Sequence, residues 1–360
     1  LQMKTLRSYH NEQIEKTKKI KRIVFSIFGI LIIISIFVFS KMYKAIMNSN
    51  VTTKDNYSLY IYDEDDFETI KNKLYSDSII INKKTFEWLA KKLDYPQYLK
   101  SGHYVIKDGM NNNQLLNMLR SGSQTPVKFT FNNIRTLEQF CQCVDEQLEI
   151  DSTELLNTIV NNPHLKELGF NKYTIPTLFI PNTYELYWNI NAEEFIEKML
   201  KEYNKFWNEE RLKKAENIKL SPVEVSVLAS IVDKETTKVG EMPRIAGVYL
   251  NRLNKNWLLQ ADPTLVFAHG DFEMKRVLDV HKEIESPYNT YKYVGLPPGP
   301  ICIPSIAAIE AVLNAENHKY MYFCAKDDMS GYHVFARTMR EHNINANKYR
   351  RALNKKRIWK

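Results

Sequence analysis

The stretch Ser221–Val239 reads SPVEVSVLASIVDKETTKV and carries the clearest helix signal in the chain. Ser221 can cap the first turn, Pro222 suits the first helical position, and Glu224 can complete a capping box with the serine. Mostly apolar residues then follow as far as Val232. The stretch therefore predicts a helix that begins at Pro222 and packs into a folded domain.

One carboxylate of this helix falls on its apolar side. Leu228, Ile231 and Glu235 are spaced i, i+3 and i+7, which places them on one stripe. Asp233 lies about 200° around the helix from Glu235. Burial raises the pKa of a carboxyl group and keeps it protonated near neutral pH, as a general acid requires for cleaving a glycosidic bond. The alternative is an edge glutamate paired with a lysine or arginine, and the spacing alone favours that alternative.

Polar and aromatic residues cluster downstream of this helix. The segments Gln260–Thr264 and Tyr288–Tyr291 combine amides, a carboxylate, hydroxyls and aromatic rings, and Gly295–Gly299 is a rigid loop. Each segment alone is typical of turns, but together they indicate a carbohydrate-binding cleft. His333 and His342 are nine residues apart, which fits no zinc site and favours structural histidines. The sequence contains no phosphate-binding glycine loop, G-x-S-x-G or H-E-x-x-H motif.

Residues 23–40, IVFSIFGILIIISIFVFS, form an uncharged apolar segment. As a helix it would rise about 27 Å, close to the thickness of the hydrocarbon core of a membrane. Residues 1–22 carry seven Lys or Arg and two Glu, so the positive-inside rule places this basic tail in the cytoplasm and the rest of the chain outside. A cleaved signal peptide is the alternative, but the segment is long for one and no small-x-small cleavage site follows it.

The net charge of +8 first indicates a nucleic-acid-binding protein, but residues 1–22 account for +5 of it. The remaining 338 residues carry only +3, whereas nucleic-acid-binding proteins concentrate basic charge on the binding domain itself. We therefore expect no nucleic-acid partner. The four cysteines match neither zinc nor redox spacings, and we expect free thiols.

With 360 residues and a mass of 42.4 kDa, the chain is long enough for two domains. Residues 41–55 are polar and are expected to form a tether. Residues 56–122 predict a small α+β unit in the order strand, helix, helix, strand, helix. Residues 126–360 predict a second, mixed α+β domain: a strand at 127–131, helices to about 219 with an interruption near Pro181, a hairpin of 320–325 and 331–336, and a basic helix at 343–360.

Several motifs together resemble the YceG-like family of membrane-anchored endolytic murein transglycosylases. The resemblance covers about residues 56–355 and is carried by LASIVDKET (228–236), VYLNRL (248–253), LQADPTL (259–265), SPYNTY (286–291), GLPPGPI (295–301), YHVFA (332–336) and EHN (341–343). A further element, IPNTY (180–184), departs from the family's Pro-Asp-Thr-Tyr because Asn182 replaces the aspartate. That departure weakens a catalytic role for position 182.

The resemblance implies that Glu235 is catalytic and that 56–122 is a LysM-like, glycan-binding subdomain ahead of the catalytic domain. It implies peptidoglycan glycan strands as the substrate, a single-pass anchor in the cytoplasmic (inner) membrane, an extracytoplasmic catalytic domain, and no metal or organic cofactor. It also makes a partnership with wall-synthesis complexes plausible. We expect the substrate-binding residues to be Gln260, Asp262, Thr264, Tyr288, Asn289, Tyr291, His333 and Asn343.

In the reaction implied by the resemblance, one carboxyl group acts twice. It protonates the oxygen leaving C1 of N-acetylmuramic acid and then takes the proton of the C6 hydroxyl that attacks C1. Two alternatives stay open. Asp262 could be the base or nucleophile of a hydrolytic muramidase, with a carboxyl separation of roughly 5–9.5 Å from Glu235. The chain could also be a non-catalytic wall-binding protein, with an exposed, salt-bridged Glu235.

Overall fold

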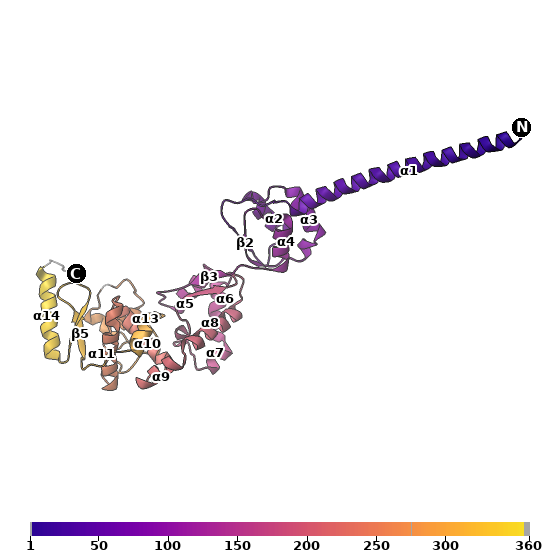
Figure 1. Cartoon of the computed structure of the whole chain (residues 1–360). Helices are drawn as coiled ribbons and strands as arrows, with labels where there is room; N and C mark the ends of the chain where they lie inside the picture. The colour runs from indigo at the N-terminus through magenta and orange to yellow at the C-terminus, as the bar shows by residue number, and fades with distance from the viewer. Residues whose placement is uncertain (1, 275, 356–360) are drawn as a thin grey trace. The chain divides into compact units, whose positions relative to one another are not determined.

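The computed structural model describes residues 2–274 and 276–355, with side chains from Glu15 onward. Two predicted regions lie partly outside the described residues. They are the basic tail at 1–22, for Leu1 and most of its side chains, and the second domain, for residues 356–360. The chain divides into two compact units, Leu1–Pro126 and Val127–Lys360 (Figure 1). Each unit is described by itself.

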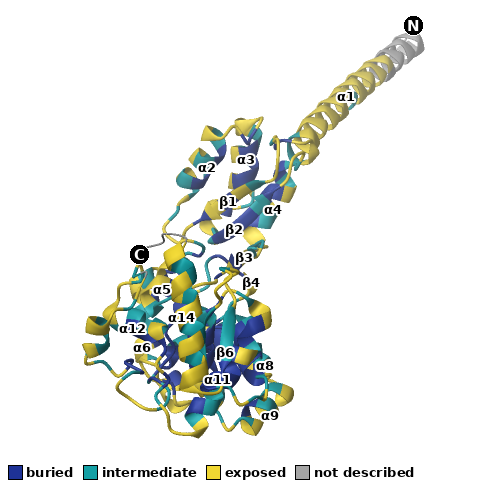
Figure 2. Ribbon diagram, turned by 90° about the vertical axis from the view of Figure 1, so that its left-hand side faces the viewer, coloured by how far each residue is buried: buried dark blue, intermediate teal, exposed yellow. Residues whose placement is uncertain are grey.

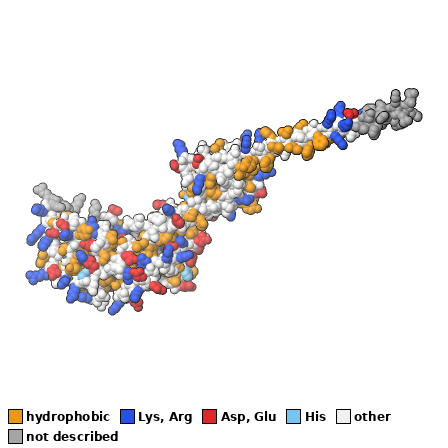
Figure 3. Space-filling model, in the orientation of Figure 1, with side chains coloured by type: hydrophobic (Ala, Val, Ile, Leu, Met, Phe, Trp, Pro, Cys, Tyr) orange, Lys and Arg blue, Asp and Glu red, His pale blue; other side chains and the backbone are white. Residues whose placement is uncertain are grey.

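The first unit opens with α1 (Gln2–Met47), whose segment Glu15–Met47 is long and apolar enough to cross a membrane. The predicted span 23–40 lies within this segment, and hydrophobic side chains are exposed along the helix (Figure 3). An apolar helix of this length, whose most apolar stretch is not buried within the first unit, is compatible with a single-pass membrane anchor.

The expected tether at 41–55 is in large part ordered structure. Helix α1 continues to Met47, and Asn50 and Val51 are buried against the first unit. The Asn50 side-chain amide donates to Asn112 Oδ1 at 2.7 Å, and Val51 forms a β-bridge with Ile80. Polar composition hid this packing, because a buried amide is acceptable wherever another amide satisfies it.

The rest of the first unit has the predicted order of strand, helix, helix, strand and helix. Its strands pair antiparallel with Tyr57 opposite Ile106. Its buried residues, dark blue on the ribbon of Figure 2, come from both strands and all three helices. The side chains of Asp66, Asn82 and Asn111 cap the helices. The elements are β1 (Tyr57–Ile61), α2 (Phe67–Ser76), α3 (Lys83–Lys92), η1 (Tyr95–Gln97), β2 (Gly102–Ile106) and α4 (Asn112–Ser121).

The first half of the second unit is helical around one short sheet. The expected interruption near Pro181 is a strand, β4, which pairs antiparallel with β3 and sets Val127 opposite Leu186. Asn182, just before β4, is exposed, and its Oδ1 accepts from the Thr183 N–H. The elements are β3 (Val127–Thr130), α5 (Leu137–Asp145), α6 (Ser152–Asn161), α7 (Pro163–Glu167), η2 (Ile175–Leu178), β4 (Thr183–Leu186), α8 (Ala192–Phe206) and α9 (Glu209–Asn217).

The second half surrounds the helix that the sequence signals most clearly. Helix α10 packs against α11, α12 and α13, and the predicted hairpin forms as β5 and β6. The basic C-terminal helix begins at Met339, four residues before its predicted start. The elements are α10 (Pro222–Glu235), η3 (Val239–Glu241), α11 (Met242–Asn254), α12 (Asp262–His269), η4 (Asp279–Glu283), α13 (Ile306–Leu313), β5 (Tyr322–Ala325), β6 (His333–Ala336) and α14 (Met339–Lys355).

Helix α10 is buried on all sides rather than along one stripe. Every residue from 225 to 232 is buried, which is the pattern of a helix at the centre of a domain. The capping box is present: Ser221 accepts from the Glu224 N–H at 3.2 Å, and Glu224 accepts from the Ser221 N–H at 2.8 Å. Asp233, Lys234 and Glu235 follow this buried stretch at the C-terminal end of α10, where Glu235 is the last helical residue.

Candidate active site

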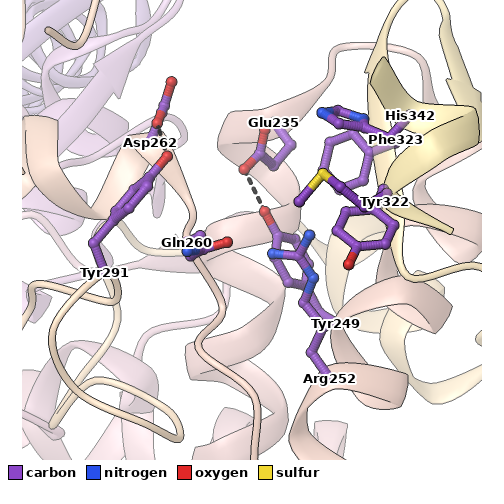
Figure 4. A pocket seen from close by; sticks show the side chains of 10 residues that line it. Glu235, Tyr249, Arg252, Gln260, Asp262, Tyr291, Tyr322, Phe323 and His342 are labelled. Carbon is purple, nitrogen blue, oxygen red and sulfur yellow. Dashed lines mark hydrogen bonds between the residues drawn. The ribbon is translucent and has the colours of Figure 1, made fainter. Parts of the chain in front are cut away.

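Glu235 lies where α10 ends, half-buried at the edge of the core. Its Oε1 accepts a short hydrogen bond from the hydroxyl of Tyr249 (Figure 4). Asp233, two residues earlier, accepts instead from the hydroxyl of Ser305. The helix therefore presents its two acidic side chains to different surroundings, as the helical geometry predicts.

Burial raises the pKa of the Glu235 carboxyl to about 7, and the negative charge of Asp262 adds to the rise. The hydrogen bond from Tyr249 and the charge of Arg252 oppose it. Among the described residues, no lysine or arginine forms an ion pair with Glu235. The alternative of an edge glutamate held by a basic partner is therefore wrong. At neutral pH this carboxyl group exchanges readily between its acid and base forms.

Helix α11 supplies two side chains that sequence reasoning missed. Tyr249 and Arg252 are spaced i, i+3 and so face the same side of the helix. Arg252 is only 8% exposed, and its guanidinium donates to the carbonyls of Met321 at 2.8 Å and Leu259 at 2.5 Å. Within VYLNRL, the signal that could have identified these two residues is that both polar side chains fall on one face of a mostly buried helix.

A polar cavity of about 350 Å³ opens beside Glu235, and we refer to it as the first cavity. Figure 4 shows Glu235 between the pair Asp262 and Tyr291 on one side and His342 with two aromatic rings on the other. Its walls come from α10, α11, the loops around α12, the β5–β6 hairpin and α14. The lining residues are Glu235, Tyr249, Arg252, Gln260, Asp262, Tyr291, Tyr322, Phe323, Met339 and His342.

Three of the sequence-predicted binding residues reach the first cavity: Gln260, Asp262 and Tyr291. The Tyr291 hydroxyl donates to the Asp262 carboxylate, so these two side chains act as one unit. Gln260 has a left-handed backbone, with φ of 49°, a conformation uncommon outside glycine and frequent at functional sites. Its N–H donates to the Thr290 carbonyl at 3.0 Å, which ties the two loops together.

Three other predicted residues lie behind the cavity wall. Thr264 is 0% exposed and its hydroxyl donates to the Ala261 carbonyl. Asn289 is also 0% exposed, and its amide donates to the carbonyls of Lys282 and Ile284, each at 2.9 Å. Tyr288 is buried against the ring of Phe267. These residues shape the loops instead of lining the cavity.

Around the C-terminal histidines, the structure places His342 at the cavity and the two residues predicted to bind substrate, His333 and Asn343, away from it. His333 is bound through both its N–H and its ring Nδ1 to the Glu241 carboxylate, each at 2.8 Å, and does not line the cavity. Asn343 is exposed on α14 and does not line it either. Its neighbour His342 does, although the sequence favoured a structural histidine there.

His342 stacks on Tyr322, with ring centroids 5.5 Å apart, and its Nδ1 is buried without a hydrogen-bond partner among the described residues. Burial and the charge of Arg252 lower its pKa. His342 is therefore a neutral ring at neutral pH. No group of His, Cys, Asp and Glu suited to a metal ion occurs in the described part of the chain, and its four cysteines are free thiols.

Glu235 and Asp262 also border a second cavity, of about 370 Å³. Its other walls come from the loop before α5, from Lys234 at the end of α10, from α12 and from the loop after α12. The remaining lining residues are Arg135, Lys234, Pro263, Val266, Phe272, Met274, Arg276 and Val277. The two carboxyl groups therefore belong to both cavities.

Comparisons with known proteins show which family and which relatives this chain is similar to. A sequence model described as the YceG-like family matches residues 59–348. An endolytic murein transglycosylase of Bacillus subtilis (strain 168) is 28% identical over 303 residues, covering 80% of this chain and 83% of that protein. One from Streptococcus pneumoniae serotype 2 (strain D39) is 30% identical over 293 residues, covering 72% of this chain and 52% of that protein. The chain thus spans about half the length of this streptococcal relative.

A solved structure is similar as well. The crystal structure of a YceG-like protein from Listeria monocytogenes aligns with a TM-score of 0.53 and 27% identity. The alignment covers 81% of this chain and 99% of that chain. The fold is therefore shared over nearly the whole length of the Listeria chain.

Proposed function

The chain belongs to the YceG-like family, and on that premise we propose that it is a membrane-anchored lytic transglycosylase that cuts glycan strands of peptidoglycan internally. The observation that carries the proposal is the carboxyl group of Glu235, which has a pKa of about 7 and faces a polar, aromatic-lined cavity. A group with this pKa can give and take a proton at neutral pH. The names of the relatives supply the substrate class.

The reaction needs one proton donor that later becomes a proton acceptor. Glu235 protonates the oxygen that joins C1 of N-acetylmuramic acid to C4 of N-acetylglucosamine, and the C1–O bond breaks. Positive charge develops on the muramoyl ring as the leaving sugar departs. The Glu235 carboxylate then takes the proton of the C6 hydroxyl, whose oxygen bonds to C1. The product ends in a 1,6-anhydro ring, no water is consumed, and Glu235 regains its proton.

The neighbours of Glu235 support both halves of this cycle. Tyr249 holds one carboxyl oxygen and leaves the other for the substrate. The buried charge of Arg252 stabilises the carboxylate that exists after the first proton transfer. Asp262, fixed by Tyr291, places negative charge where the muramoyl ring becomes positive.

Anchoring and location complete the proposal. Helix α1 would hold the protein in the cytoplasmic membrane with its basic end inside, and the part of the chain that follows Met47 would face the cell wall. The unit at 56–122, with its strand–helix–helix–strand–helix order, would act as a LysM-like glycan-binding module. An enzyme tethered in this way meets new strands close to the complexes that make them.

The test is digestion of purified peptidoglycan by the detergent-solubilised full chain, with products weighed by mass spectrometry. We expect products with anhydro ends, lighter by one water than hydrolytic products, and none from Glu235→Gln. Reducing-end products would identify a hydrolase and assign Asp262 as its base or nucleophile. Strand binding without any products would identify a wall-binding protein.

A further inference from the structure

The second cavity contains three cationic side chains that the proposed proton transfers do not use, besides the carboxyl groups of Glu235 and Asp262 that it shares with the first cavity. Arg135, Lys234 and Arg276 line it together with apolar side chains. In the described part of the chain, neither Arg135 nor Arg276 forms an ion pair with a carboxylate. Cationic groups beside apolar walls fit an anionic ligand that also carries apolar parts.

Arg135 is held in place without being neutralised. Its guanidinium lies over the ring of Phe272, 5.3 Å from the centroid. The adjacent Ile134 carbonyl accepts from the Ile303 N–H at 2.9 Å, which fixes the backbone of this segment. An arginine stacked on a ring keeps the N–H groups at its edge available, and their fork matches a carboxylate.

Lys234 differs from the two arginines. Its Nζ donates to Asn133 Oδ1 at 2.7 Å and lies 3.5 Å from Asp233, so its charge is already balanced. It also precedes Glu235 directly in the chain. Arg135 and Arg276 are therefore the cations of the second cavity that have no carboxylate partner, while the carboxyl groups of Glu235 and Asp262 stand at the border with the first cavity.

The first cavity is built differently. Its one arginine, Arg252, already donates to two backbone carbonyls, and its remaining walls are mainly aromatic rings, amides and hydroxyls. Such walls suit neutral sugar rings. The two cavities share Glu235 and Asp262, so a strand cut at Glu235 would place different chemical groups on its two sides.

The two sugars of the proposed substrate differ in one anionic feature. N-acetylmuramic acid carries a lactyl ether that ends in a carboxyl group or continues as a peptide, and N-acetylglucosamine carries no such group. We propose that the second cavity binds the carboxylate borne by this muramoyl substituent through Arg135 and Arg276. This inference rests on the proposed function. It explains how the enzyme cuts after muramic acid and not after glucosamine, since only one register brings a carboxylate to the arginines.

The inference is tested with the double variant Arg135→Met/Arg276→Met of the full chain in detergent. Arg135→Lys/Arg276→Lys keeps the charge but removes the fork, and Lys205→Met removes an exposed cation of α8 in the same unit. Three strand preparations are compared: peptide-bearing strands, peptide-free strands with lactyl carboxylates, and strands whose carboxyl groups have been coupled to ammonia. Thermal unfolding checks that each variant is folded.

We expect the methionine double variant to raise KM about tenfold on carboxylate-bearing strands, because it loses charge-assisted contacts, with kcat within about twofold. The lysine variant should fall between it and the wild type, and Lys205→Met should match the wild type. On amidated strands the wild type should already show the raised KM, and the double variant should add nothing. If the double variant has a raised KM on peptide-bearing strands alone, the arginines bind the stem-peptide carboxylate. If its KM is raised on peptide-free strands, they bind the lactyl carboxylate. A KM raised equally on amidated strands, or raised on none of the strands, overturns the inference.

Binding separates this inference from the proposed function. Labelled strands are titrated with Glu235→Gln, alone and combined with the double substitution. If the wild type cleaves no strand, the proposed function fails. A tenfold weaker binding of carboxylate-bearing strands alone would still support the second cavity as a carboxylate site. Binding that does not depend on the carboxylates overturns the site whatever the activity.

Discussion

Gln260, Asp262 and Tyr291 reach the first cavity, whereas Thr264 and Asn289, from the same two segments of the chain, 260–264 and 288–291, are buried behind it. The first group belongs to the cavity wall, by which we mean the ten lining residues. The second group, with Thr290, forms what we call the loop scaffold. The members of both groups that come from these two segments are polar or aromatic side chains of similar kinds. Only the direction of each side chain separates a residue that reaches the cavity from one that holds the loop.

The two regions should therefore fail in different ways. A substitution in the cavity wall removes a group that acts on the substrate and leaves the fold intact. A substitution in the loop scaffold leaves buried donors or acceptors unsatisfied and lowers stability first. A variant with a substitution in the cavity wall can even be more stable than the wild type. The reason is that functional groups are often held in unfavourable surroundings, and the substitution removes that cost.

The largest effect is expected for Glu235→Gln, which removes the proposed acid and base. We expect kcat on peptidoglycan to fall at least about 1,000-fold, measured as anhydro-ended product. Because the folded-state pKa is raised from 4.5 to about 7, the wild type loses stability as the pH rises through that window. Glu235→Gln should lack this loss and be more stable at pH 8, by on the order of 2 kcal/mol. A variant less stable than the wild type at pH 8 would contradict this account.

Arg252→Met tests the buried charge of the cavity wall. We expect kcat to fall about 100-fold, because the carboxylate formed on Glu235 loses its positive neighbour. Arg252→Lys should keep part of the activity. The matched control is Arg244→Met on the same helix, where the arginine is exposed and paired with Glu316 at 2.8 Å. If Arg252→Met and Arg244→Met lowered kcat equally, the position of Arg252 in the cavity wall would have no special effect on the reaction.

Tyr249→Phe removes the hydroxyl that donates to Glu235. Because this bond lowers the pKa of Glu235, the pKa should rise in the variant. Activity that requires the protonated acid falls as the pH rises through that pKa, so the alkaline limb of kcat/KM against pH should move to higher pH. We expect kcat itself to drop about tenfold. Tyr184→Phe, which removes a hydroxyl bonded to the Ile180 carbonyl, should leave the profile unmoved.

Asn289→Ala is the corresponding test of the loop scaffold, and its effect on chemistry should be the smallest. It removes an amide that holds two carbonyls and accepts from the Tyr291 N–H at 3.0 Å. We expect stability to fall by about 2 kcal/mol, with kcat within a fewfold of the wild type once the protein is folded. Asn161→Ala, at an exposed asparagine of α6, should change neither. A large loss of kcat without a change in unfolding temperature would place Asn289 in the cavity wall.

The elements of the first unit could be predicted because each one is signalled locally. Asp66, Asn82 and Asn111 cap its helices as short polar residues do, and aromatic and β-branched residues mark its strands. Strand β4 was missed because four residues carry little periodicity of their own and form a strand only by pairing with β3.

The site was predicted in part for the same reason. Glu235 was found because its helix is strongly signalled and its spacing places it beside buried residues. Tyr249 and Arg252 were missed because nothing local shows that α11 lies against α10. Asn343 was predicted as a binding residue and its neighbour His342 was not. Adjacent residues on a helix point about 100° apart, and only the packing of α14 decides which of the two faces the cavity.

The sequence by itself determined the long apolar segment within α1, the order of elements in the first unit, the helix that ends at Glu235, and the family. Each of these depends on residues close together in the chain, whose spacing acts through backbone geometry and burial. The tertiary structure alone decided which polar residues form the cavity wall, which ones form the loop scaffold, and that two arginines border a second cavity. Those outcomes depend on contacts between segments far apart in sequence, and no local pattern encodes the direction in which a loop side chain finally points.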